Sequence, residues 1–291
     1  GMGNSRLPLI FVAIACAVNI VGDLFFVAVL HMNVAGAALA TVLAQAVSVV
    51  LSLVIIRRQK LPFTMTLKDI GINPEIWNFV KVGSPIAFQE ILTQLSFLAL
   101  CAFINRLGLE ASSGYGVANK IVSFIMLLPS ALMQTMSAFV AQNVGAGRED
   151  RARKALFTGI GIGCAIGIFI GVFAFFRGDL MAYIFTGDPA VIRRAAQYLR
   201  GFAPEAVVTA VSFSFIGYFN GHSQTMFVMF QGLCQTFLVR LPMSYFMSIQ
   251  ENASLAWIGT AAPLATVFGI VLNTVYFIWY HRCVICRTGR K

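Results

Sequence analysis

The chain has 291 residues, of which 58% are hydrophobic and only 11% are charged. Soluble domains carry about a quarter charged residues, so this chain has too few polar side chains to cover a surface in water. The net charge of +10 would suit nucleic acid, but no basic cluster is interleaved with aromatic residues in a polar segment, which excludes such a partner from our expectations.

Eight apolar segments are long enough to cross a bilayer, for which about 20 residues are needed. In chain order they cover residues 8–30, 34–56, 77–105, 115–141, 155–176, 196–219, 225–248 and 255–281. The runs are unbroken and do not alternate strictly between polar and apolar residues, so they predict helices rather than barrel strands. We therefore expect an all-α integral membrane protein with about eight transmembrane helices.

Two connecting segments stand out because the other loops are short. Residues 58–75 are rich in charge, proline and glycine, and we interpret them as a cytoplasmic linker between two helix bundles. Asp188 followed by Pro189 is typical of an N-cap and a first helical position. This pair predicts a short helix near the membrane surface before the sixth span.

The distribution of basic residues predicts the orientation, because cytoplasmic loops carry more Lys and Arg. The side of the N-terminus has the larger and more clustered set, so we expect both termini in the cytoplasm. That set comprises Arg6, Arg57, Arg58, Lys60, Lys68, Arg148, Arg151, Arg153, Lys154, Arg282, Arg287, Arg290 and Lys291.

Short stretches near the start of the chain reappear near its end. "GNS" at 3–5 and "GAALATV" at 36–42 are echoed in the same order by "GHS" at 221–223 and "GTAAPLATV" at 259–267. Long internal repeats are typical of transporters built from two related halves. On this interpretation, residues 1–57 are the last two helices of one lobe, residues 76–291 are a six-helix second lobe, and the chain lacks the first four helices of the first lobe.

Glu90 and Arg240 are ionisable residues deep within predicted spans, where such residues are rare and usually face a cavity or one another. Gln89 and Gln94 lie beside Glu90, and Pro85 one turn earlier frees a backbone carbonyl. Two alternatives stay open: Glu90 and Arg240 form a structural ion pair, or Glu90 binds a cation or substrate.

Glu205 follows Pro204 within the sixth predicted span and also has two interpretations. If the helix passes through Pro204, the proline bends it and Glu205 becomes a buried carboxylate at the bend, suited to a cation. If the helix begins at Pro204, Glu205 is a first-turn acid favoured by the helix dipole. The pattern of residues alone does not decide between them.

Asn19 and Asp23 are four residues apart in the first span and therefore face one side. We expect a structural polar contact between helices there, and we keep both as secondary site candidates. Lys81 lies near the cytoplasmic end of its span, where its side chain can reach the interface.

Enzyme chemistry has little support. The three histidines stand at the ends of spans, and the chain has no catalytic triad pattern, G-x-S-x-G motif or phosphate loop. "CVIC" at 283–286 is a single C-x-x-C without a second ligand pair. We expect no enzyme activity, no cofactor, and no metal beyond a coupling Na⁺.

Several motifs resemble the multidrug and toxic-compound extrusion (MATE) family of cation-coupled antiporters. "GMGNSRLPLIFVAIACAVNIVGDLFFV" resembles the fifth helix of that family and "GSPIAFQEILTQLSF" the seventh. "AFVAQNVGAGREDRARKA" resembles the end of the eighth, and the stretch from "FTGDPAV" to "GYFNG" resembles the approach to the tenth. The resemblance covers the whole chain and implies helices five to twelve of a two-lobe fold with six helices in each lobe.

The resemblance also implies site residues. In one branch of the family, an acidic residue on the tenth helix stands twelve residues before a Gly-Tyr pair, as Glu205 stands before Gly217 and Tyr218 here. That branch has a second acid eight residues after the proline of the seventh helix. Thr93 occupies this position, and Glu90 comes one turn earlier. The resemblance therefore implies Glu205, with Glu90, as the cation or proton site.

The function expected from these observations is a secondary active antiporter that exports organic, cationic compounds in exchange for Na⁺ or H⁺. Its partners would be the small-molecule substrate and the bilayer of a bacterial inner membrane, and the full-length protein would be a monomer. A lipid-linked sugar flippase of the same superfamily and a non-transporting membrane scaffold are the alternatives. The candidates for the substrate cavity are Phe88, Gln89, Thr93, Gln94, Phe97, Tyr218 and Arg240.

Overall fold

The computed structural model describes residues 6–58, 75–250 and 254–282, and within these ranges all regular structure is helical. The chain divides into two units, residues 1–73 and 74–291, which are described separately. Seven described helices are long and apolar enough to span a membrane, and a bent helix pair adds an eighth. The predicted all-α membrane fold with about eight spans is thus confirmed. The central part of the predicted linker and the CVIC motif fall outside the described residues.

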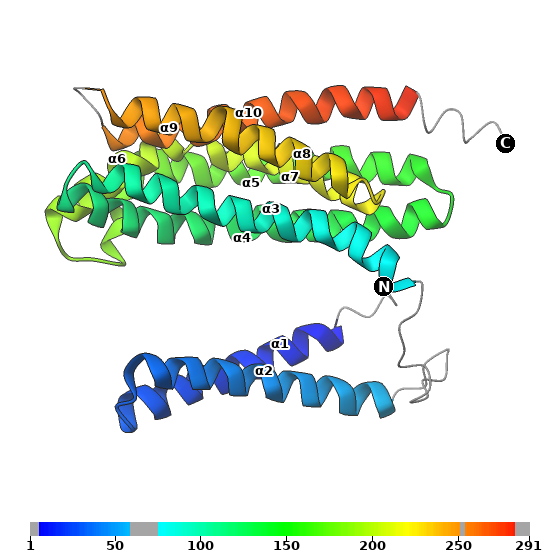
Figure 1. Cartoon of the computed structure of the whole chain (residues 1–291), viewed down its shortest axis with the longest axis horizontal. Coiled ribbons are helices and arrows are strands. Elements are labelled where there is room, and N and C mark those ends of the chain that lie inside the picture. Colours follow the sequence, from blue (N-terminus) through cyan, green and yellow to red (C-terminus); the bar gives the residue numbers. More distant parts are fainter. Residues whose placement is uncertain (1–5, 59–74, 251–253, 283–291) are drawn as a thin grey trace. The chain divides into compact units, whose positions relative to one another are not determined.

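The first unit is a pair of helices (Figure 1). α1 (Arg6–Asp23) continues into the π-helical segment η1 (Leu24–Val29), and α2 (Asn33–Arg58) follows after a tight turn. The two helices approach closely at small residues: a Cβ on Gly22 would lie 3.0 Å from Ala40 Cβ. Close backbone approach at Gly and Ala is the usual packing mode of membrane helices, because the bilayer itself provides no hydrophobic drive to associate.

The second unit contains the remaining elements (Figure 1). They are α3 (Glu75–Asn105), α4 (Leu109–Gly145), α5 (Glu149–Tyr183), α6 (Pro189–Phe202), α7 (Glu205–Gly221), α8 (Thr225–Leu233), η3 (Cys234–Arg240), α9 (Leu241–Ser248) and α10 (Leu255–Tyr280). α7 packs against α4, α5 and α10, so most of its side chains are buried. The polar groups of α7 therefore face protein rather than lipid.

Two spans differ from the simple helices that the sequence predicts. The sixth is a broken span, in which α6 and α7 meet at a bend of 49°. The helix expected after Asp188 is α6, the first half of this span. The C-terminal half of α6 is buried among the neighbouring helices. The seventh contains the π-helical η3 between α8 and α9. Proline explains the first irregularity, because Pro204 has no N–H to continue the helix.

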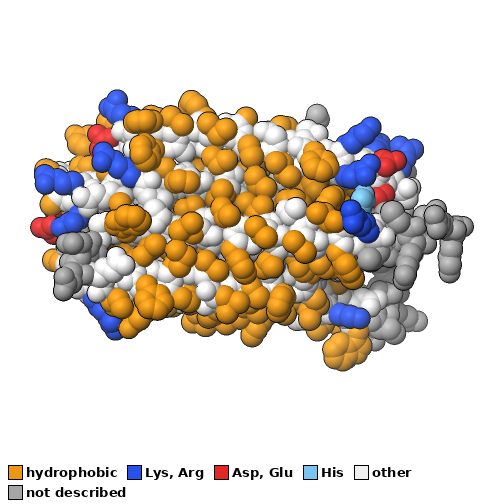
Figure 2. All heavy atoms as spheres, turned by 90° about the horizontal axis from the view of Figure 1, so that it is seen from above, with side chains coloured by type: hydrophobic (Ala, Val, Ile, Leu, Met, Phe, Trp, Pro, Cys, Tyr) orange, Lys and Arg blue, Asp and Glu red, His pale blue; other side chains and the backbone are white. Residues whose placement is uncertain are grey.

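The surface matches a membrane environment. Figure 2 shows a face on which hydrophobic side chains form a broad band, with Lys and Arg gathered toward its two ends. Large apolar side chains such as Phe169 and Trp257 are mostly exposed within the described structure. A surface with so many exposed apolar side chains is unfavourable in water and suits the interior of a bilayer.

Candidate functional site

The break between α6 and α7 places Glu205. Asp188 caps α6, its side chain accepting a hydrogen bond of 2.9 Å from Ala190 N, as the sequence predicts. α7 then starts directly after Pro204. The N–H groups of Val207 and Val208 bond to the Pro204 carbonyl oxygen at 3.1 and 3.2 Å. The Glu205 carboxylate therefore does not cap its own helix and is left to bond elsewhere.

Glu205 is 8% exposed and points into the second unit. Its Oε1 accepts hydrogen bonds of 2.8 Å from the hydroxyls of both Thr209 and Thr266. Thr209 is one turn along α7, whereas Thr266 comes from α10. Both sequence interpretations thus describe part of the site: Glu205 begins a helix, and it is also a buried carboxylate at a bend.

The second carboxylate oxygen of Glu205 is buried without a hydrogen-bond partner among the described residues. Burial of a charge is costly unless the group is paired or hydrogen-bonded. The nearby ionisable groups that act electrostatically on it are Arg240 of η3 and Tyr198 of α6. Oε2 is consequently the atom at which a cation or a proton would compensate the buried charge.

A chain of side-chain hydrogen bonds leads to Glu205 from α8. Gln231 Nε2 donates to Gln235 Oε1 at 2.7 Å, and Gln235 Nε2 donates to Thr266 Oγ1 at 3.1 Å. Thr266 in turn donates to Glu205. Every donor is directed toward the carboxylate, so the network fixes its position.

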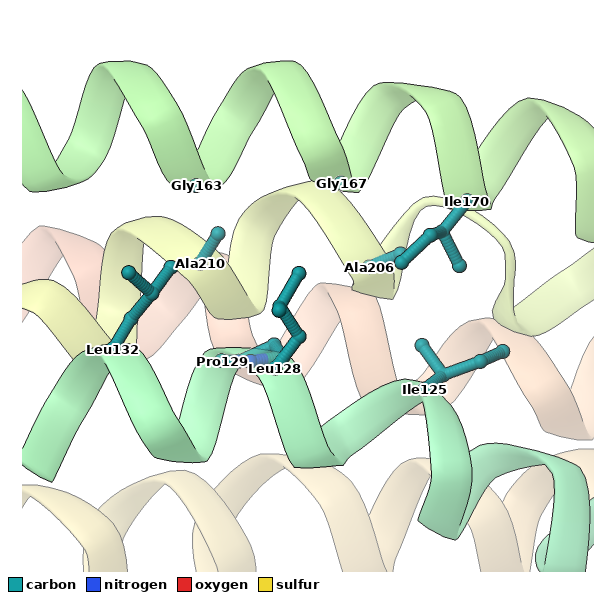
Figure 3. Close-up of a pocket in the computed structure, with 9 residues that line it drawn as sticks. All are labelled: Ile125, Leu128, Pro129, Leu132, Gly163, Gly167, Ile170, Ala206 and Ala210. Atoms are coloured by element: carbon teal, nitrogen blue, oxygen red, sulfur yellow. The ribbon is translucent and has the colours of Figure 1, made fainter. Parts of the chain in front are cut away.

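Glycines on α5 allow α7 to approach at the level of Glu205. A Cβ on Gly167 would lie 2.5 Å from the Ala206 carbonyl oxygen, and one on Gly163 would lie 2.9 Å from Ala210 Cβ. Figure 3 shows these residues around a small apolar pocket beside Pro129 of α4. The volume of this pocket is about 10 Å³. A pocket of that size holds at most one water-sized sphere, so the helix crossing next to Glu205 is closely packed.

The candidates on α3 lie apart from this network. Glu90 and Gln94 are exposed within the second unit, Phe88 is 52% exposed, and Thr93 is half-buried. The Gln89 amide packs against Gly232 of α8. Within the described ranges no hydrogen bond or ion pair connects Glu90 with Glu205 or Arg240, so the alternative of a Glu90–Arg240 ion pair is not what the structure contains.

Arg240 and Tyr218 have partners that the sequence did not reveal. The Arg240 guanidinium lies 4.3 Å from the centre of the Phe97 ring, a cation–π contact between η3 and α3. Tyr218 is fully buried, and its hydroxyl donates to Glu149 Oε1 at 2.5 Å. Glu149 Oε2 also lies 3.0 Å from His222 Nε2, so the end of α7 is tied to the start of α5.

A second hollow, of about 410 Å³, lies along α4 and α5. It is lined by Leu132, Thr135, Met136, Phe139, Arg151, Lys154, Ala155, Thr158 and Gly159. None of the predicted cavity candidates contributes to it, and its two charged residues are cationic. This hollow is therefore not the cavity that the sequence analysis expects for cationic substrates.

The secondary candidates lie together in the first unit. Asn19 Nδ2 is 3.4 Å from both Asp23 Oδ2 and Thr41 Oγ1. Thr41 belongs to α2, so the group is a polar contact between the two helices, as expected. Asn19 therefore links the two helices, whereas Asp23 contacts only Asn19 of its own helix and its Oδ1 is buried without a hydrogen-bond partner among the described residues.

The sequence analysis named neither hydrogen-bond partner of Glu205, Thr209 or Thr266. Thr209 could have been found, because a hydroxyl four residues after an acid faces the same side of a helix. Thr266 and Gln235 offered no such signal, since their position depends on how α8, η3 and α10 pack.

Residues 85–246 match the model of the MatE family. The chain belongs to the MatE family. Among other members, the probable multidrug resistance protein YpnP of Bacillus subtilis is 26% identical over 89% of the chain and 56% of its own length. The probable multidrug resistance protein NorM of Thermotoga maritima is 23% identical over the whole chain and 64% of its own length. An FAD transporter of Shewanella oneidensis is 23% identical over 83% of the chain and 55% of its own length.

Solved structures of MATE transporters share the fold. A MATE in complex with MaD3S has a TM-score of 0.85 at 18% identity, covering 99% of this chain and 64% of its own. A MOP-superfamily transporter from Pyrococcus furiosus has a TM-score of 0.82 at 18% identity, covering 92% and 62%. This MatE chain therefore spans less than two thirds of the length of these relatives.

Proposed function

We propose that the chain is part of a secondary active antiporter, which exports organic, cationic compounds from a bacterial cell in exchange for Na⁺ or H⁺. Membership of the MatE family supports transport, and several members at 22–26% identity are named as multidrug resistance proteins. Because the chain spans only part of the length of those relatives, the proposed activity is that of a full-length transporter that contains this chain.

The observation that carries the proposal is Glu205 Oε2, which is buried and has no hydrogen-bond partner in the described part of the chain. A buried carboxylate with one free oxygen is stabilised when a cation or proton binds there. A gradient of that ion can therefore drive a cycle in which Glu205 is loaded from one side of the membrane and released on the other. Glu90 is proposed as a second acidic group, on the exposed face of α3.

The flippase alternative has less support. A lipid-linked diphosphate would be bound by several cationic side chains, and Arg240 already contacts the Phe97 ring. The carboxylate of Glu205 is negatively charged when ionised and would then repel such an anion. We therefore retain export of cations as the proposed function.

The experiment measures accumulation of a fluorescent organic cation, ethidium, in efflux-deficient cells. The cells express the full-length transporter, its Glu205→Gln variant, or a Glu110→Gln control. Glu110 is also an acid of the second unit, but it is exposed and lies 3.9 Å from Arg194. Low accumulation with the wild type and the control, and high accumulation with equally expressed Glu205→Gln, is the expected result. Equal protection by all three would remove Glu205 from the mechanism, and no protection by any would favour the flippase.

A further inference from the structure

A row of polar side chains continues from the Glu205 network toward the other end of α10. We call it the α8–α10 polar seam, and it consists of Gln224, Gln231, Gln235, Thr266, Asn273 and Tyr276. Its members on α10, Thr266, Asn273 and Tyr276, face one side of that helix together with Gly269, because these positions are three or four residues apart. Thr266 and Tyr276 are ten residues apart, which corresponds to about 15 Å along the helix.

Contacts at several levels fix the register of the two helices. Gln235 donates to Thr266 at 3.1 Å, and the Tyr276 hydroxyl donates to Gln224 Oε1 at 3.0 Å. Between these levels, Gly269 has no side chain and faces the amides of Gln231 and Gln235. The helices are therefore antiparallel, and Asn273 lies one turn beyond the level of Gln231.

The middle of the seam contains buried polar atoms without partners. Asn273 and Gln231 are both 0% exposed. Neither amide atom of Asn273 has a hydrogen-bond partner among the described residues, and Gln231 Oε1 has none there either. An unpaired amide is costly in a membrane interior. One donor and two acceptors are a set that buried water satisfies, since such water makes about three hydrogen bonds.

A titratable group lies beyond each end of the seam. Next to Thr266 is Glu205, whose Oε2 has no hydrogen-bond partner among the described residues. At the other end, Gln224 Nε2 donates to the carbonyl of His222 at 3.4 Å, and His222 Nε2 lies 3.0 Å from Glu149 Oε2. The Glu149 side chain is 25% exposed, so this end lies at the surface of the second unit.

We propose that the α8–α10 polar seam is a hydrated path along which protons pass between the Glu149–His222 pair and Glu205, through water held by Asn273 and Gln231. This inference rests on the proposed role of Glu205 and adds the route by which that group is reached. Water carries the proton, and the amides hold the water in place. The π-helical η3 contributes by presenting Gln235 to Thr266, and π-helical turns are frequent at functional sites.

The test follows hydrogen–deuterium exchange of the protonated Glu205 carboxyl by infrared spectroscopy. The 291-residue chain in lipid nanodiscs is acidified until a carboxyl band appears, and Glu205→Gln assigns that band by removing it. The sample is then transferred to deuterated buffer at the same acidity. We expect exchange in Asn273→Leu to be slower by about tenfold or more. Asn273→Ser, which keeps a polar group and leaves room for water, should exchange at nearly the wild-type rate.

Asn220→Leu is the control, because Asn220 is a partly buried asparagine whose Oδ1 also has no partner among the described residues, but it lies on α7, outside the seam. It should exchange like the wild type. Equal rates in the wild type and Asn273→Leu, or equal slowing by Asn273→Leu and Asn220→Leu, would overturn the path while leaving the role of Glu205 intact. Failure of Glu205→Gln to remove a carboxyl band would instead contradict the proposed function.

Discussion

The close approach of α5 and α7 beside Glu205 makes a quantitative prediction for Gly167→Ala. The added Cβ would lie 2.5 Å from the Ala206 carbonyl oxygen and 3.0 Å from Val207 Cα, both backbone atoms, whereas ordinary contacts begin near 3.4 Å. The helices must therefore separate by roughly 1 Å, and overpacking of this kind costs about 1–3 kcal/mol. Alanine also gains about 1 kcal/mol of helix propensity over glycine, which partly offsets the cost.

Gly161→Ala isolates the packing cost. Gly161 lies in the same helix, and a Cβ there would meet nothing within 4 Å, so this variant has the propensity gain alone. The assay is reversible unfolding of the chain in SDS, followed by circular dichroism. We expect Gly167→Ala to be less stable than Gly161→Ala by about 1–3 kcal/mol. Equal free energies of unfolding for the two variants would refute the packing argument.

Two further predictions concern hydrogen bonds around α7. Thr266→Val removes a donor to Glu205 and leaves Gln235 without its acceptor, so it should lower the free energy of unfolding by about 1–3 kcal/mol. Thr274→Val is the control, because the exposed Thr274 hydroxyl bonds only to its own helix, and it should change the free energy of unfolding much less. Equal effects of the two variants would contradict the network. Tyr218→Phe removes a hydrogen bond to the Glu149 carboxylate and should lower the free energy of unfolding by about 1.5–3 kcal/mol. An unchanged unfolding midpoint in the same SDS titration would show that this bond does not stabilise the fold.

The spans could be predicted because the length of an apolar run is a local property that the bilayer thickness fixes. The expected last span, 255–281, corresponds to α10 at Leu255–Tyr280. The cap at Asp188 could be predicted for the same reason, since an N-cap depends on neighbouring residues. The π-helical segments could not, because a shift to i→i+5 bonding leaves no clear signal in composition.

The environment of Glu205 lay beyond the sequence for a physical reason. One hydrogen-bond partner of Glu205, Thr209, is only four residues away. The other, Thr266, is 61 residues away in the chain. Whether the carboxylate faces water or protein is decided by α4, α5 and α10, which pack around α7. Gln231 Oε1 and the Asn273 amide, which have no hydrogen-bond partners among the described residues, likewise become visible only once α8 and α10 are aligned.

The most direct test of the central claim measures coupled ion flux through the full-length transporter in proteoliposomes. An outward gradient of ethidium is imposed, and uptake of Na⁺ or H⁺ into the vesicles is recorded for the wild type, Glu205→Gln and Glu110→Gln. If Glu205 binds the coupling ion, the wild type and Glu110→Gln take up ions as ethidium leaves, and Glu205→Gln does not. Ion uptake by Glu205→Gln at the wild-type rate would contradict the account.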